Sequence, residues 1–189
     1  VAALSSRAAS MLATAGPWSA LTSVEAYTPT GWTPLPPLPH AANMATACVL
    51  NGRLYVMGGH RSKKLQVLEW SEENEFSWTV EAELPEERHS AACSAIDGKL
   101  WLMGGRDVNK QEPASVLVYD IASDSWTEGA SFVRAPGICR AVRYDGQLYL
   151  FGDQEVLVYG NEDWVRVNTW GVDRIARLQY AACNSILFG

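Results

Sequence analysis

The residue types best suited to chemistry in this chain are histidine and cysteine, and their spacing is a poor match to known sites. The three histidines are His40, His60 and His89. Imidazole is a common ligand of copper and zinc, but no HxH or HExxH spacing occurs. The sequence also contains no GxSxG segment, P-loop or dinucleotide-binding fingerprint. We therefore predict no catalytic residue, no metal site and no cofactor.

The four cysteines are spaced at 45, 46 and 44 residues, at Cys48, Cys93, Cys139 and Cys183. No CxxC pair is present, which argues against a zinc knuckle. We interpret the cysteines as small buried hydrophobic residues in equivalent positions of a repeat. A ring of thiols that converges on a metal is the alternative. Disulfides would need a secreted context that nothing in the sequence supports, so we expect a cytoplasmic protein.

The elements that must position these residues recur at nearly the same interval. Three apolar segments end in glycine, and their first glycines, Gly58, Gly104 and Gly152, are 46 and 48 residues apart. A period of about 40–50 residues is typical of small β units stacked side by side. Such a repeat builds a scaffold, and the function of a scaffold lies in the loops between its strands. The segments read Leu54-Tyr-Val-Met-Gly-Gly59, Leu100-Trp-Leu-Met-Gly-Gly105 and Leu148-Tyr-Leu-Phe-Gly-Asp153.

Each period is predicted to contain four strands in the same order. The first strand is rich in small and β-branched residues and ends in an Asx-Gly turn, which is a strong hairpin signal. The second strand ends at the glycines, the third ends on an aromatic residue, and the fourth begins on a tryptophan. We expect these aromatic residues to pack between adjacent units. The turns are Asn51-Gly52, Asp97-Gly98 and Asp145-Gly146, and the tryptophans are Trp78, Trp126 and Trp164.

Four antiparallel strands per period describe a propeller blade, and the pattern of a glycine doublet, a tyrosine and then a tryptophan resembles the kelch repeat. Tyr119-Asp120 followed by Trp126, and the segment from Trp32 to Pro39, are similar to its consensus. The resemblance covers residues 19–189 and implies an all-β, kelch-type β-propeller of four-stranded antiparallel blades. It implies about three whole blades, with partial blades at both ends of what we interpret as a fragment. The expected blades are 19–39 (partial), 40–84, 85–133, 134–170 and 171–189 (partial), and residues 1–18 are expected to be poorly ordered or a worn strand.

The loops offer the best candidates for binding. In a propeller, the loops from second to third strand and from fourth strand to the next blade gather on one face. In kelch proteins that bind acidic peptides, arginines and serines in these positions make the contacts. Guanidinium groups suit carboxylate recognition because they donate two parallel hydrogen bonds. The resemblance therefore implies a partner-binding set of Arg61, Lys63, Arg88, Ser90, Arg106 and Arg134.

The overall composition restricts the class of partner. The formal net charge is −6, which argues against nucleic-acid binding. No apolar run reaches the roughly 18–20 residues that span a bilayer. We predict a non-catalytic scaffold that recognises a protein or acidic peptide, and the resemblance implies a substrate adaptor of a cullin-type ubiquitin ligase as one such role. The alternatives are a kelch-fold enzyme, such as an oxidase or sugar epimerase, and binding to actin or another cytoskeletal protein.

Overall fold

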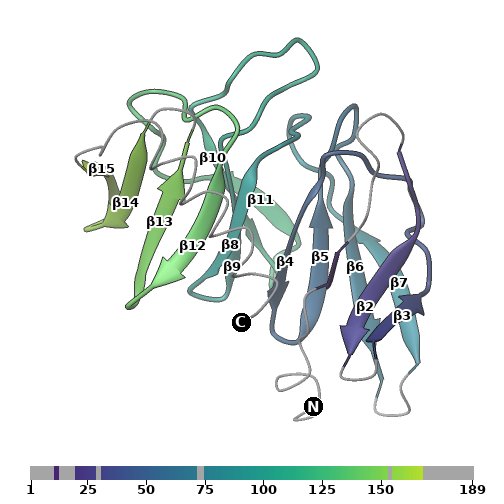
Figure 1. Cartoon of the computed structure of the whole chain (residues 1–189). Helices are drawn as coiled ribbons and strands as arrows, with labels where there is room; N and C mark the ends of the chain where they lie inside the picture. Colours follow the sequence, from purple (N-terminus) through teal and green to yellow (C-terminus); the bar gives the residue numbers. More distant parts are fainter. Residues whose placement is uncertain (1–10, 13–19, 29–30, 72–74, 153–154, 168–189) are drawn as a thin grey trace.

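The computed structural model describes residues 11–12, 20–28, 31–71, 75–152 and 155–167, which form antiparallel sheets (Figure 1). We call these sheets blades 1 to 4 in chain order. Across the described residues there is no helix, and so none that could cross a lipid bilayer. The late partial blade that the sequence predicts at 171–189 lies outside the described residues. Blade 1 contains β1 (Met11–Leu12), β2 (Val24–Thr28) and β3 (Gly31–Leu35).

The other blades each have four strands that pair in chain order. The all-β propeller architecture predicted from the repeat is confirmed. Blade 2 contains β4 (Thr46–Leu50), β5 (Arg53–Met57), β6 (Leu65–Trp70) and β7 (Phe76–Glu81). Blade 3 contains β8 (Ala92–Ile96), β9 (Lys99–Met103), β10 (Val116–Asp120) and β11 (Ser125–Glu128). Blade 4 contains β12 (Arg140–Tyr144), β13 (Gln147–Phe151), β14 (Val156–Gly160) and β15 (Asp163–Val167).

The Asx-Gly turns join the first two strands of blades 2, 3 and 4, as predicted. Both residues of each turn have positive φ, for example 51° at Asn51 and 76° at Gly52. This is the type I′ geometry that matches the twist of the flanking strands. The β14–β15 turn has the same positive φ at Asn161 and Glu162 without any glycine. The Asx-Gly rule could not detect that turn.

The hydrophobic core lies between the blades. Tyr55 and Val67 of blade 2 pack against Leu100 and Leu117 of blade 3, and all four side chains are almost fully buried. A second layer, which includes Leu148, lies between blades 3 and 4, and a third lies between blades 1 and 2. Because each layer takes side chains from two sheets, burial of apolar surface holds neighbouring blades together.

The tryptophans that begin the fourth strands add a polar contact to each of these joints. The indole Nε1 donates a hydrogen bond to a main-chain oxygen in the segment that leaves the preceding blade. The distances are 2.8 Å for Trp78 to Pro36, 3.0 Å for Trp126 to Ala82 and 3.0 Å for Trp164 to Ala130. The rings of Trp126 and Trp164 also pack against aromatic neighbours, as between Tyr119 and Trp126 at 5.1 Å. The predicted structural role of these residues is therefore confirmed.

The glycine doublets let the chain pass close to two neighbours. A Cβ atom on Gly58 would lie 2.3 Å from the main-chain oxygen of Arg88, in the segment that leads to blade 3. A Cβ atom on Gly59 would lie 2.8 Å from the oxygen of Asn43, in the segment that leads into blade 2. The first glycine of the doublet therefore lies against the segment that leads to the next blade, and the second lies against the segment that leads into its own blade.

The cysteines do not occupy equivalent positions, and that prediction is wrong. Cys48 pairs with Tyr55 in the β4–β5 ladder, but Cys93 pairs with Leu102 in the β8–β9 ladder. Their spacing is 45 residues, whereas Gly58 and Gly104 are 46 apart. Since side chains alternate along a strand, one residue of offset turns them to opposite faces. Cys139 lies before β12 and is fully buried, and Cys183 lies outside the described residues.

Candidate protein-interaction face

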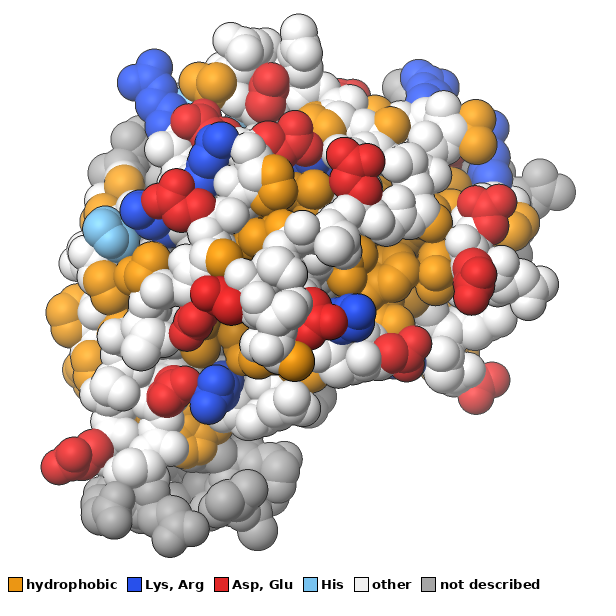
Figure 2. Space-filling model, turned by 180° about the vertical axis from the view of Figure 1, so that it is seen from behind, with side chains coloured by type: hydrophobic (Ala, Val, Ile, Leu, Met, Phe, Trp, Pro, Cys, Tyr) orange, Lys and Arg blue, Asp and Glu red, His pale blue; other side chains and the backbone are white. Residues whose placement is uncertain are grey.

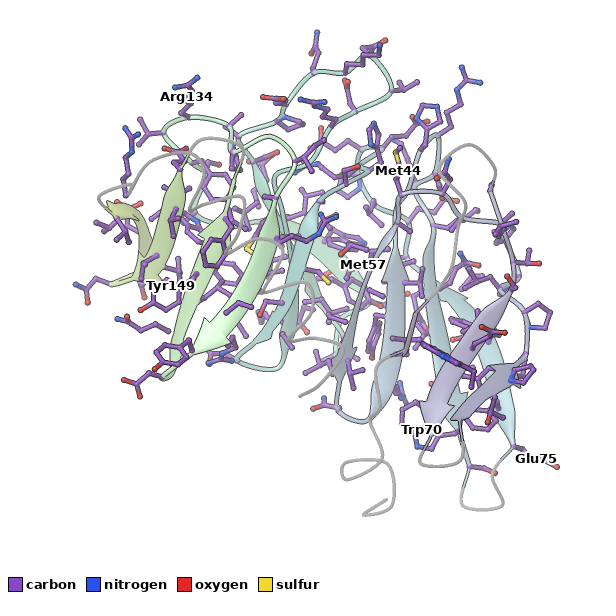
Figure 3. All side chains as sticks on the ribbon, viewed as in Figure 1. Met44, Met57, Trp70, Glu75, Arg134 and Tyr149 are labelled. Carbon is purple, nitrogen blue, oxygen red and sulfur yellow. The ribbon has the colours of Figure 1, made fainter. Side chains whose placement is uncertain are left out.

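The two predicted loop sets meet at one end of the blades and are joined by main-chain hydrogen bonds. His60 N donates to Asn43 O at 2.8 Å, and His89 and Arg106 exchange two bonds of 2.9 Å. We call this end the loop face and define it as residues 40–45, 58–64, 84–90, 104–115 and 131–139. Figure 3 shows Met44 and Arg134 at this end and Trp70 and Glu75 toward the other end.

The segments that lead into successive blades bond to one another at the centre of the loop face. Ser90 N donates to Met44 O at 2.9 Å, and Cys139 N donates to Ser90 O at 3.4 Å. Both Met44 and Ser90 have positive φ, 56° and 54°. The Ser90 hydroxyl lies 3.2 Å from His89 Nδ1. Ser90 therefore links three blades through its main chain, which is a structural role that its type did not predict.

Arg88 is buried under the loop face, so the expectation that it contacts a partner is corrected. Only 1% of the residue is exposed. Its guanidinium donates to Ser115 O at 2.9 Å, Ser115 Oγ at 2.8 Å and Gly104 O at 3.3 Å, and it forms an ion pair with Glu86. Burial lowers the pKa of Arg88 to about 10. The side chain thus stays charged at neutral pH and braces the loops of blade 3.

Lys63 and Arg106 lie on the loop face but bind to the protein itself. Lys63 Nζ donates to Pro85 O at 2.7 Å. Arg106 directs Nε and one terminal nitrogen at Glu112 Oε1, at 2.9 and 2.6 Å. Both residues are half-buried. A partner carboxylate would have to compete with these internal acceptors.

Arg61 and Arg134 are exposed. Neither guanidinium makes a hydrogen bond or ion pair within the part of the chain that the structure describes. Arg61 stands at a φ of 59°, where the loop between β5 and β6 turns. These two side chains can offer both guanidinium edges to a carboxylate without breaking an internal contact. Of the predicted partner-binding residues, Arg61 and Arg134 are therefore exposed, Lys63 and Arg106 bond within the protein, and Arg88 is buried.

Exposed aliphatic residues on the loop face were missed by the sequence reasoning. Met44 is 43% exposed, Val108 40% and Val133 fully exposed, and the exposed Lys110 lies two residues after Val108 in the β9–β10 loop. The available signal was a single apolar residue within a polar loop, as in Val108 between Asp107 and Asn109. Viewed from behind, basic and acidic side chains mix toward the upper end of the molecule (Figure 2). The face is therefore amphipathic rather than uniformly basic.

His60 and His89 form an edge-to-face pair with ring centroids 5.4 Å apart. Burial lowers the pKa of His89, and the charge of His60 lowers it further. No group of three or more histidine, cysteine or acidic side chains within the described residues could hold a metal ion. The pair therefore packs at the joint between the β5–β6 loop and the segment before β8.

The fold and the loop face together define a β-propeller whose loops form one continuous surface. The kelch motif family model matches residues 41–71 and 87–132. Blades 2 and 3 thus carry kelch motifs, as the sequence predicts, and kelch motifs mark a propeller fold commonly used for protein interaction.

A solved structure, "Structure of YjhT", has the same fold. The TM-score is 0.59 at 16% sequence identity, over 72% of this chain and 55% of that chain. This chain therefore spans about half the length of that structure. A search of curated proteins gave no significant match.

Proposed function

We propose that this protein is a non-catalytic interaction module whose loop face binds an acidic protein segment that also carries apolar side chains. The observation that carries the proposal is the pairing of exposed cations with exposed aliphatic residues, in particular Arg134 beside Val133. Charge-assisted, two-point hydrogen bonds from arginine give orientation to a carboxylate. Burial of the neighbouring aliphatic side chains adds affinity that salt does not screen.

The internal contacts of the loop face also support binding. Arg88, Ser90 and Arg106 hold the loops in place through bonds to other loops, made by the side chain of Arg88 and the main chains of Ser90 and Arg106. Loops that are already ordered lose less conformational entropy when a partner binds. We therefore expect the partner to bind a preformed surface on which Arg61 and Arg134 are exposed.

The test uses an acidic peptide that contains leucine, selected from a displayed library on the purified protein. The variant Arg61→Glu/Arg134→Glu is expected to weaken binding at least tenfold, measured by titration calorimetry. The matched control is Arg53→Glu/Lys99→Glu, which makes the same charge change at residues next to the Asx-Gly turns. Equal weakening in both variants would show a net-charge effect only, and unchanged affinity in the first variant would reject the site.

We propose an interaction role in preference to an enzymatic one, and two assays can distinguish these roles. Metal analysis of the purified protein and an oxidase assay on alcohols and sugars should both be negative. Turnover that follows bound copper would overturn the interaction role as the main function.

The finer role of a cullin ligase adaptor rests on the kelch motifs and not on any contact in the structure. It predicts that the full-length gene product co-precipitates with a cullin. We also propose a cytoplasmic location, which the free thiols of Cys48 and Cys93 favour because reducing compartments preserve thiols. Cell fractionation tests this location.

A further inference from the structure

Cys48 and Cys93 face each other across the joint between blades 2 and 3. Their strands, β4 and β8, are the innermost of their blades and lie side by side. The one-residue offset in spacing turns Cys48 toward blade 3 and Cys93 toward blade 2, and both pack against the same core layer. Thr46, two residues before Cys48 on the same face of β4, donates its hydroxyl to Cys93 Sγ at 3.2 Å. Side chains of β4 therefore reach the sulfur of Cys93.

The two thiols differ in acidity. Hydrogen bonds from the thiol of Cys48 and the hydroxyl of Thr46 lower the pKa of Cys93, against burial, which raises it. The same contact with Cys93, together with burial, raises the pKa of Cys48. The thiolate is the reactive form of cysteine, and the hydrogen bond from the Thr46 hydroxyl to the sulfur favours that form at Cys93, so we assign Cys93 as the nucleophile of the pair. Both residues are half-buried, so a small oxidant has to reach sulfur atoms that the core layer largely covers.

We propose that Cys48 and Cys93 are a peroxide-reactive pair that closes to a disulfide between blades 2 and 3. The Cys93 thiolate attacks one oxygen of hydrogen peroxide, the O–O bond breaks, and the released hydroxide takes a proton to leave as water. Cys93 is then a sulfenic acid. The sulfur of Cys48 attacks that of Cys93, its proton and the hydroxyl group leave as a second water, and the S–S bond forms. Two thiols are oxidised by two electrons, and one peroxide is reduced to two waters.

The disulfide would join strands that begin directly beside the centre of the loop face. Met44 lies four residues before Cys48, and Ser90 lies three residues before Cys93. Their main chains already bond to each other at 2.9 Å. A covalent link between β4 and β8 would fix this contact and restrict the unfolded chain. Oxidation is thus expected to raise the urea midpoint of unfolding.

The experiment treats the reduced, purified protein with a small excess of hydrogen peroxide, followed by alkylation, digestion and mass spectrometry. The expected product is a peptide that links Cys48 to Cys93, and Cys139→Ser should form it at the unchanged rate. Thr46→Val should slow its formation several-fold without abolishing it. In Cys48→Ser, dimedone should label Cys93 as the sulfenic acid.

Three outcomes would overturn the proposal. One is that Cys48 and Cys93 stay reduced while Cys139 or Cys183 reacts. Another is that dimedone fails to label Cys93 in folded Cys48→Ser, where folding is checked by circular dichroism. The third is a linked peptide that forms only between two molecules, shown by a covalent dimer on a non-reducing gel.

Discussion

The indole nitrogen of Trp126 donates a hydrogen bond of 3.0 Å to the carbonyl oxygen of Ala82. Trp126 lies on the outermost strand of blade 3, and Ala82 lies where the chain leaves blade 2. Asp124 accepts a bond from the N–H of the same Ala82 at 3.0 Å, so blade 3 binds both polar groups of this residue. The contacts between neighbouring blades therefore repeat with the same period as the sequence.

Replacement of Trp126 with phenylalanine should remove this bond but keep most of the ring packing. We expect the free energy of unfolding to fall by about 1–2 kcal/mol, since the carbonyl of Ala82 loses its partner. Urea unfolding measures the change. Trp70→Phe is the control, because its indole N–H donates no hydrogen bond within the described residues, and it should stay within about 0.5 kcal/mol of wild type. Equal effects of the two changes would contradict the assigned role.

The glycine doublet gives a second prediction. Gly58 and Gly98 both have positive φ, 63° and 74°, but a Cβ atom at Gly58 would strike Arg88 O while one at Gly98 meets open space. Gly98→Ala should cost about 1 kcal/mol from backbone strain alone. Gly58→Ala should cost about 1–3 kcal/mol more, because the main chain of Arg88 must shift. Chemical unfolding of both variants decides this, and a Gly58→Ala effect no larger than that of Gly98→Ala would disprove the close approach.

The fold was predictable because its signals are local and repeat. An Asx-Gly dipeptide specifies a type I′ hairpin by its own backbone preferences, so the turn at Asn51-Gly52 needed no tertiary information. The turn at Asn161-Glu162 has the same conformation without the glycine, so the dipeptide rule did not identify its type. The fourth-strand tryptophans were recognisable as joints because they recur in phase, although their acceptors on the preceding blade were not foreseen.

The candidate site was predictable only as a set of loops. Whether an arginine is exposed depends on partners far along the chain, and Ser115 is 27 residues from Arg88. The sequence cannot show that Arg88 and Ser115 meet, so it gave no reason to expect that Arg88 is buried while Arg61 is exposed. The opposed faces of Cys48 and Cys93 likewise depend on a one-residue offset that becomes clear only from the register.

His89 gives a third prediction, on the dependence of stability on pH. Burial, the charge of His60 and the nearby Arg106 lower its pKa, while contacts with Asp107 oppose the shift. The unfolded chain, in which histidine has a pKa of about 6.5, then binds more protons than the folded chain just below that pH. Stability should therefore be lost as the pH falls through about 6.5 toward the folded pKa.

The variant His89→Gln removes that proton-binding site. Its free energy of unfolding should fall less than that of wild type between pH 7.5 and pH 5.5. Urea titrations of both proteins at about a half-dozen pH values across this range measure the two changes. Between pH 7.5 and 8.5 the two proteins should show parallel behaviour, which serves as the internal control. Identical losses on acidification would assign the pH dependence to other groups.

Arg88 gives the last prediction, because its side chain and its main chain bind different blades. Its carbonyl oxygen accepts a bond of 2.8 Å from Gly59 N in blade 2, while its guanidinium binds Gly104 and Ser115 in blade 3. Arg88→Met keeps the apolar stem but leaves these acceptors unpaired. Hydrogen bonds from charged groups contribute about 1.5–3 kcal/mol, so we expect a loss of about 2–4 kcal/mol in unfolding free energy.

Arg88→Lys distinguishes charge from geometry. An ammonium group keeps the charge beside Glu86 but cannot reproduce the planar fork that reaches Ser115 and Gly104 together. It should recover only part of the loss measured for methionine. The exposed Arg61→Met is the matched control and should change stability by no more than about 0.5 kcal/mol. If Arg88→Met is as mild as Arg61→Met and instead weakens partner binding, Arg88 belongs to the binding surface and not to the joint between blades.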